Sequence, residues 1–274
     1  MCPRVSVFTI GFCYYLSSFF IVNLMKALKT ILISVYVIII ILLLLSLLRC
    51  RNDVPQHTDI IPKPVIKEKF KADVVMCIDC TSSMNNIINT IKNNALTFYP
   101  DLKQRCISQG KEITSMRIRV IGFRDVGDTT PFEKSEFYNI PDRKDDFKNF
   151  VSHLLPVGGG DDPEHGYDAL AMAINSDWRK EKDVHQIIIL WTDNASHPLS
   201  GMNGVPASVE ELKSQWNEKM NNKGKRLVLF APLDVSWTEL EKTWNNTTRH
   251  DVSTGGALSD VDYEDILKTL SERI

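Results

Sequence analysis

Residues 72–79, Ala-Asp-Val-Val-Met-Cys-Ile-Asp, form a near-continuous apolar run that ends in the carboxylate of Asp79. Such a run is typical of a strand that is buried on both faces of a parallel sheet. Cys80-Thr81-Ser82-Ser83 follows it, and a helix is predicted next. The apolar positions of that helix recur at intervals of three and four residues: Met84, Ile87, Ile88, Ile91, Ala95 and Phe98.

Further along the chain, short apolar runs alternate with helical periods. Strands are expected at 117–123, 135–140, 186–192, 226–231 and 248–252, and the polar run 135–140 suits a sheet edge. Helices are expected at 142–154, from Pro163 onward, at 207–221, 236–244 and 260–273. This alternation predicts an α/β fold: a doubly wound, mostly parallel sheet with one antiparallel edge strand and helices on both faces.

The charge of the chain is distributed unevenly. Residues 1–51 contain five basic residues and no Asp or Glu, which leaves 27 basic and 34 acidic residues in 52–274, a formal charge of about −7. Nucleic-acid binding rests on clustered Lys and Arg, so we expect no nucleic-acid partner. Cys77 and Cys80 have a C-x-x-C spacing without a second pair, which favours small buried residues over a zinc or redox site.

An uncharged stretch at 30–48 is predicted to be a transmembrane anchor. As a helix its 19 residues would span roughly 28 Å, close to the hydrocarbon thickness of a bilayer. A cleaved signal peptide is the alternative, but the run is long for one and no small-residue cleavage site follows it. Residues 49–69, with three prolines, are interpreted as a linker to a domain at 70–274.

The membrane topology depends on a second apolar stretch at 5–25, which is less hydrophobic because polar residues interrupt it. Met25-Lys26-Ala27-Leu28-Lys29 has the character of a signal-anchor start, which would make residues 1–24 an over-extended reading frame. A single span then places the domain outside the cytoplasm, as we expect. The alternative is a two-helix hairpin, which would place the domain in the cytoplasm.

Oxygen ligands gather at the predicted carboxyl ends of the strands, where open α/β sheets bind their ligands. Asp79 and Asp193 each end a strand, and Thr81 and Ser83 follow Asp79 at alternating positions. The loop Gly158-Gly159-Gly160 supplies Asp161 and Asp162. Carboxylates and hydroxyls without clustered imidazole or thiolate suit Mg²⁺, Mn²⁺ or Ca²⁺ better than Zn²⁺.

Four motifs in this order resemble those of von Willebrand factor type A domains, in the branch of the hemicentin and alpha-kinase-associated proteins. The resemblance covers about 70–274. Asp79-Cys-Thr-Ser-Ser-Met84 is similar to the D-x-T-G-S-M form of the metal-ion-dependent adhesion site (MIDAS). The other three are Gly122-Phe-Arg-Asp125, the G-G-G-D-x-P-E loop at 158–164, and Leu190-Trp-Thr-Asp-Asn-Ala195 with His197.

The resemblance implies a divalent cation, Mg²⁺ first, held by Asp79, Thr81, Ser83 and Asp193. It also implies a protein partner whose acidic side chain often completes the coordination. Two positions depart from the adhesive members of the family: Ser82 replaces a glycine, and Asp161 stands where a threonine is common. Asp161 is therefore a further predicted ligand, and its charge puts integrin-style binding of an acidic partner in doubt.

Residues beside the predicted site have plainer interpretations as well. Asp162-Pro163-Glu164 has the pattern of a helix start, with Asp162 as the N-cap, although Asp162 is also a candidate rim residue. His165 and His197 either lie on the rim or are ordinary surface histidines. Arg124-Asp125 is interpreted as a structural turn with an ion pair and not as a source of metal ligands.

Three functions compete on this evidence. We expect a membrane-tethered, non-enzymatic module that binds a protein partner through the metal. A structural domain without bound metal is the first alternative. A metal-dependent phosphohydrolase is the second, but that chemistry needs an Asp two residues after Asp79, where this chain has Thr81.

Overall fold

The computed structural model describes residues 29, 32, 34–46, 64–94, 96–160, 162–202, 204–220, 224–252 and 263–273. The chain divides into two units, Met1–Pro62 and Lys63–Ile274. In the first unit, residues 34–46 are helical and their apolar side chains are exposed. No helix of the described residues is both long enough and apolar enough to span a bilayer. The apolar stretch at 5–25, including Met25, lies outside the described residues, as do several positions of the expected anchor at 30–48.

The second unit alternates strands with helices, as the sequence predicts. Its elements are β1 (Glu68–Asp79), η1 (Ser82–Met84), α2 (Asn85–Asn94), α3 (Phe98–Ser108), β2 (Lys111–Phe123), β3 (Phe132–Lys134), β4 (Tyr138–Ile140), α4 (Lys144–His153), α5 (Gly166–Ile174), β5 (Val184–Trp191), α6 (Val209–Lys219), β6 (Lys225–Ala231), α7 (Val235–Thr243), β7 (Thr247–Asp251) and α8 (Tyr263–Arg273).

One mixed sheet forms the centre of this unit. Its strand order is β3-β2-β1-β5-β6-β7, with β4 also paired to β2. Strands β2, β1, β5, β6 and β7 are parallel, whereas β3 and β4 run antiparallel to β2. The mostly parallel sheet is thus confirmed, and the expected antiparallel edge consists of two short segments.

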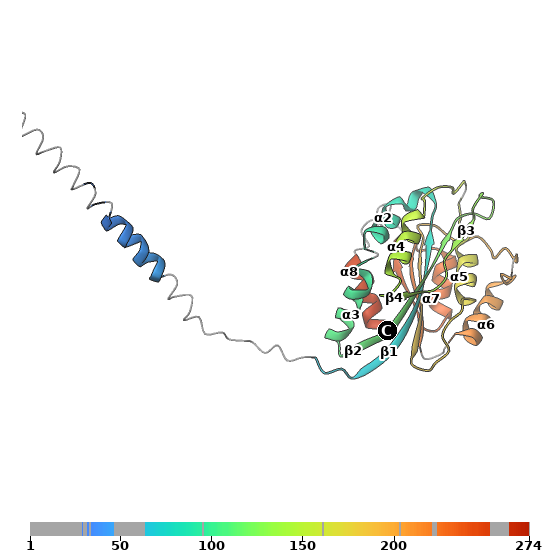
Figure 1. Cartoon of the computed structure of the whole chain (residues 1–274). Coiled ribbons are helices and arrows are strands. Elements are labelled where there is room, and N and C mark those ends of the chain that lie inside the picture. Colours follow the sequence, from blue (N-terminus) through green and yellow to red (C-terminus); the bar gives the residue numbers. More distant parts are fainter. Residues whose placement is uncertain are drawn as a thin grey trace, which may run out of the picture. The chain divides into compact units, whose positions relative to one another are not determined.

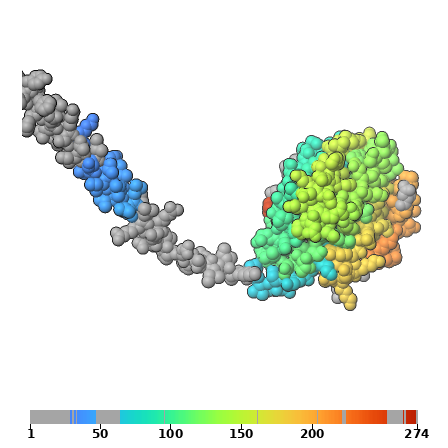
Figure 2. Space-filling model, viewed as in Figure 1, coloured from blue at the N-terminus to red at the C-terminus, as the bar shows by residue number. Residues whose placement is uncertain are grey.

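Helices cover both faces of the sheet, and Figure 1 shows α2, α3, α4 and α8 on one side and α5, α6 and α7 on the other. Successive side chains of a strand point to opposite faces, so a strand buried on both sides needs apolar residues at nearly every position. Val74 and Met76 of β1 join the core beneath the first group, and Val75 and Cys77 join the core beneath the second. In the space-filling view of the same side, α4 and its neighbouring residues occupy the middle of the visible surface of this unit (Figure 2).

The single helix expected from Met84 to Phe98 is instead divided, and this prediction was wrong. Helix α2 ends at Asn94, whose side-chain amide donates a 2.9 Å hydrogen bond to the carbonyl of Thr90. Asparagine competes in this way with the helical backbone pattern. Phe98 begins α3, and its side chain is buried in the core beneath α2.

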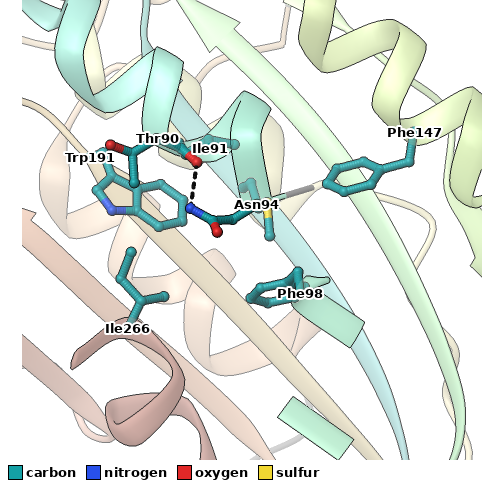
Figure 3. Close-up of a pocket in the computed structure, with 8 residues that line it drawn as sticks. Thr90, Ile91, Asn94, Phe98, Phe147, Trp191 and Ile266 are labelled. Carbon is teal, nitrogen blue, oxygen red and sulfur yellow. Dashed lines mark hydrogen bonds between the residues drawn. The ribbon is translucent and has the colours of Figure 1, made fainter. Parts of the chain in front are cut away.

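A small apolar cavity of about 30 Å³ lies within the first core. Figure 3 shows Phe98, Trp191 and Ile266 converging on it, together with Phe147 from α4. An apolar cavity of this size offers a water molecule too few polar partners to hold it in place. Ile266 of α8 thus forms one wall of this pocket.

Candidate functional site

The loop after β1 folds its polar side chains onto Asp79. The side chain of Asp79 is fully buried, and its Oδ1 accepts hydrogen bonds from the Thr81 backbone N–H (2.9 Å) and the Thr81 hydroxyl (2.7 Å). The Oγ of Ser83 lies 3.3 Å from Oγ1 of Thr81. The tight turn thus brings together the three oxygen-bearing side chains that the sequence singled out. Their role as metal ligands stays a prediction.

The carboxyl end of β5 meets the same point from the neighbouring strand. Thr192, which follows β5, donates a 2.8 Å hydrogen bond from its hydroxyl to Oδ2 of Asp79. Asp193 is exposed, and its charge lies close enough to raise the pKa of Asp79. Parallel strands place their carboxyl ends at one edge, which is why residues more than a hundred positions apart converge here.

The glycine loop approaches this turn closely. Gly158 and Gly159 have φ values of +87° and +77°, which favour glycine. The carbonyl of Gly158 accepts hydrogen bonds from the backbone N–H (3.4 Å) and the hydroxyl (3.1 Å) of Ser82. A Cβ on Gly159 would lie 2.9 Å from Cβ of Thr81 and 3.1 Å from Oε1 of Glu164. The absence of a side chain at Gly159 lets these two residues face each other.

Glu164 is the site residue that the sequence interpretation missed. Only 3% of it is exposed, and its Oε2 is buried without a hydrogen-bond partner in the part of the chain that the structure describes. Burial, together with the nearby charges of Asp79, Asp125, Asp162 and Asp128, raises the pKa of Glu164 to about 8. A buried carboxyl among other carboxyls lacks a compensating positive charge.

The same environment acts on Asp79. Burial raises its pKa to about 6, against the lowering effect of the hydrogen bonds from Thr81 and Thr192. The hydrogen bonds stabilise the carboxylate, but desolvation and the charge of Asp193 outweigh them. Asp79 and Glu164 are therefore both harder to ionise than ordinary carboxyls.

Asp162 does not cap a helix, which corrects the sequence prediction. Helix α5 begins at Gly166, with His165 in the N-cap position, rather than at Pro163. Asp162 is exposed and accepts a hydrogen bond from the side-chain amide of Asn194. The chain instead bends at Asp162 and Pro163, and Glu164 forms an isolated parallel bridge with Ser196, so Glu164 precedes the helix and is not part of it. The other acid of this loop, Asp161, lies outside the described residues.

Backbone pairing fixes Glu164 against the loop that follows β5. Its N–H donates to the carbonyl of Ala195 (3.2 Å), and its carbonyl accepts from the N–H of His197 (2.7 Å). This pairing also brings His165 and His197 side by side, with ring centroids 4.6 Å apart. The signal that could have revealed Glu164 is the final position of the G-G-G-D-x-P-E loop, which the sequence interpretation assigned to a first helical turn.

Arg124 has the structural role that the sequence favoured. Its guanidinium is buried, donates to the carbonyls of Val157, Thr130 and Leu155, and pairs with Glu133 at 2.8 Å. It thereby fastens the glycine loop to the end of β2. Asp125 does not take part in that ion pair and instead lies 3.1 Å from Nδ1 of His165. Cys77 and Cys80 are buried free thiols, as expected.

Comparison with known proteins gives similarities of structure only. No protein-family model and no curated protein matches the chain. Similar solved structures include a von Willebrand factor type A protein from Catenulispora acidiphila, with 15% identity, a TM-score of 0.48, and coverage of 74% of this chain and 43% of that one. The PilB minor pilin of Streptococcus sanguinis has 12% identity and a TM-score of 0.47 over 76% of this chain and 63% of that one.

A third similar structure is proximal thread matrix protein 1 from the mussel byssus, with a zinc-occupied MIDAS motif. It shares 17% identity with this chain, with a TM-score of 0.44 over 75% of this chain and 48% of that one. The chain therefore spans between two fifths and two thirds of these three proteins.

Proposed function

We propose that residues 70–274 form a von Willebrand factor type A-like domain that binds a protein partner through a divalent cation. The proposed ligands are Asp79, Thr81, Ser83, Asp193 and, added from the structure, Glu164. Asp161 remains a proposed ligand from the sequence. The observation that carries the proposal is the buried carboxyl of Glu164, whose Oε2 has no hydrogen bond from any described residue. Its other oxygen, Oε1, lies opposite Thr81 across Gly159.

The donor set fits a hard cation. It consists of carboxylate and hydroxyl oxygens, which Mg²⁺ and Mn²⁺ prefer, and it has no thiolate. Asp79 and Glu164 both have raised pKa values, so each gains from a positive charge nearby. A bound ion would supply that charge, and a coordination position that Asp161 does not occupy would be open to an acidic side chain of the partner. Asp161 and Asp162 add two negative charges to the sequence after Gly160, which favours a partner whose acid is flanked by basic residues.

The metal is tested by calorimetric titration of Mg²⁺ and Mn²⁺ into the full chain in mild detergent. We expect saturable binding to the wild type and none to Asp79→Ala. Asp177→Ala is the matched control. Asp177 is also an acid, but it is exposed and lies beside Arg117, toward the start of β1 and away from the proposed site. Equal, negligible heats for the wild type and Asp79→Ala would contradict metal binding. They would favour the alternative of a structural domain without bound metal.

The partner is tested by capture on the immobilised chain with and without a chelator. We expect a bound protein that chelator releases and Mg²⁺ restores, and that Asp79→Ala does not retain. A partner that binds equally in chelator would contradict recognition through the metal. We also propose that the domain is not an enzyme, and a metal-dependent phosphatase assay should stay at the level of the buffer.

We propose further that residues 30–48 anchor the chain in a membrane, with the domain outside the cytoplasm. The support is the uncharged sequence and the exposed apolar side chains of the helical residues 34–46. The chain should stay with membranes at alkaline pH, and protease added to intact cells should cleave the domain. Release of the chain at alkaline pH would contradict a membrane anchor at 30–48. Protection of the domain from protease would place it in the cytoplasm.

A further inference from the structure

A second cluster of ligating side chains lies beside the proposed site. Asp125 follows β2, His165 precedes α5, and His197 belongs to the loop after β5. One ligand atom from each residue lies within 4.8 Å of the other two. The sequence places these residues at three distant positions, so only the pairing of Glu164 with the loop at 195–197 brings the two rings to Asp125.

The spacing of these atoms suits a four-coordinate ion. Oδ1 of Asp125 lies 3.1 Å from Nδ1 of His165 and 3.7 Å from Nε2 of His197. Tetrahedral ligands about 2.0–2.1 Å from a zinc ion stand roughly 3.3 Å from one another. The two separations from Asp125 bracket that value, and one ligand nitrogen of each histidine lies within 4.8 Å of the other.

Two partners place opposite demands on Nδ1 of His165. The N–H of Val126 donates to Nδ1 of His165 over 3.2 Å, which requires an unprotonated Nδ1. The same Nδ1 lies 3.1 Å from Oδ1 of Asp125, so one ring nitrogen is shared between the Val126 N–H and this carboxylate. Protonating Nδ1 would repair this contact but would oppose the Val126 N–H. A metal ion bound by both acceptors would attract both lone pairs, in competition with a hydrogen bond that is already long.

Asp125 provides an independent observation. Its side chain is only 9% exposed, and its buried Oδ2 has no hydrogen-bond partner among the described residues. A buried carboxylate oxygen without a partner is costly, and buried charges are generally paired or bound to metals. Arg124, the adjacent cation, is turned away toward Glu133 and the glycine loop.

The cluster remains open to solvent on the side of the histidines. The side chain of His165 is 16% exposed and that of His197 is 28% exposed. Three protein ligands with an accessible fourth position are the arrangement of zinc sites that bind water or an external ligand. Imidazole nitrogen selects zinc-class transition metals over Mg²⁺, which separates this cluster from the oxygen ligands around Asp79.

We propose that Asp125, His165 and His197 form a second cation site, selective for zinc-class transition metals and independent of metal binding at Asp79. Its ion binds one carboxylate oxygen and two imidazole nitrogens, with a water molecule or a side chain of the partner as the fourth ligand. The site stands whether or not the Asp79 site binds Mg²⁺.

The test uses Co²⁺, whose visible absorption intensifies in a four-coordinate site. The full chain, stripped of metal in mild detergent, is titrated with Co²⁺ and then with Zn²⁺. We expect one equivalent of intense absorption that Zn²⁺ abolishes. His165→Ala and His197→Ala should each weaken Co²⁺ binding by at least about tenfold. His153→Ala, which changes an exposed histidine at the end of α4, should leave binding unchanged.

Asp79→Ala separates this proposal from the proposed function. The second site predicts full Co²⁺ absorption in Asp79→Ala, together with loss of Mg²⁺ binding. Absorption that disappears in Asp79→Ala but survives in both histidine variants would assign the ion to Asp79 and overturn the second site. Absence of the band from the wild type would overturn it as well.

A measurement on the wild type alone covers the case in which the histidine variants do not fold. Cu²⁺ added at one equivalent should show electron-spin-echo modulation from two imidazole rings, and Zn²⁺ should displace it. Modulation from no imidazole or from a single ring would contradict the proposal. Circular dichroism shows whether each histidine variant is folded. If the variants are folded, the Co²⁺ titration decides; if they are not, the Cu²⁺ measurement on the wild type decides.

Discussion

The hydroxyl of Thr192 donates a 2.8 Å hydrogen bond to Oδ2 of Asp79 and so joins the carboxyl ends of β5 and β1. This contact holds the buried carboxylate in one orientation, with Oδ1 toward Thr81. The position of Asp79 in the proposed site therefore depends on a residue from the neighbouring strand.

Thr192→Val should weaken Mg²⁺ binding by about tenfold, because a hydrogen bond to a charged group contributes about 1.5–3 kcal/mol. Valine keeps the shape and removes the donor. Calorimetry measures the affinity, and Thr243→Val, which loses a hydroxyl on α7, is the control. Unchanged affinity in Thr192→Val would show that Thr81 alone orients Asp79.

Gly159→Ala should destabilise the domain and weaken Mg²⁺ binding. Its φ of +77° costs about 1–2 kcal/mol for an alanine, and the new Cβ would press on Thr81. We expect the thermal midpoint to fall by about 2–6 °C. Gly160→Ala is the matched control, since a Cβ there meets nothing within 4 Å. Equal effects at the two glycines would contradict the close approach at Gly159.

Glu164→Gln should separate metal binding from stability. The amide has the size of the carboxyl but no charge, so Mg²⁺ affinity should fall by at least about tenfold. In chelator at pH 7, the variant should unfold at about the same temperature as the wild type, because a carboxyl with a pKa of about 8 is already mostly neutral. Thermal unfolding with and without Mg²⁺ checks both effects. A variant that binds Mg²⁺ as tightly as the wild type would remove Glu164 from the site.

The buried ion pairs of Asp73 predict a pH dependence of stability. Burial raises the pKa of Asp73, but hydrogen bonds from Arg117 and Arg179 outweigh it and hold the pKa below its usual value. A carboxyl with a lowered pKa in the folded state stabilises the fold above its unfolded pKa of about 4. That stabilisation is lost as the pH falls through the lower pKa of the folded state.

Asp73→Asn should therefore cost about 3–5 kcal/mol at pH 7, because two arginines lose their buried partner. The difference from the wild type should shrink progressively below a pH of about 4. Denaturant unfolding at a series of pH values measures this, with Asp142→Asn, an exposed acid, as the control. A difference that stays constant down to acid pH would contradict the assigned shift.

Ile266→Ala should destabilise the domain by about 2–4 kcal/mol. Ile266 is 5% exposed and lines the 30 Å³ apolar cavity beneath α8, so its removal leaves a larger unfilled space beside the core. Lys268→Ala changes an exposed position of the same helix and should have little effect. A cost below about 1 kcal/mol would show that α8 moves in to close the cavity.

The sequence alone determined the class of the fold. The apolar runs at β1 and β5 require burial on both faces, and a sheet buried on both faces needs helices on both sides. Periodicity is a local property, so it located these strands and most helices. It did not locate the break after Asn94, where a side-chain amide competes with the helical backbone, or the two-part edge at β3 and β4.

The sequence also placed Asp79, Thr81, Ser83 and Asp193 at strand ends, because parallel strands bring their carboxyl ends to one edge. Only the tertiary structure decided the rest of the site. Glu164 faces Asp79 because its backbone pairs with the loop at 195–197, which delays the start of α5 to Gly166. The same pairing brings His165 and His197 to Asp125. Pairing between distant loops leaves no periodic signal in a sequence, so these neighbours emerge only when the chain is folded.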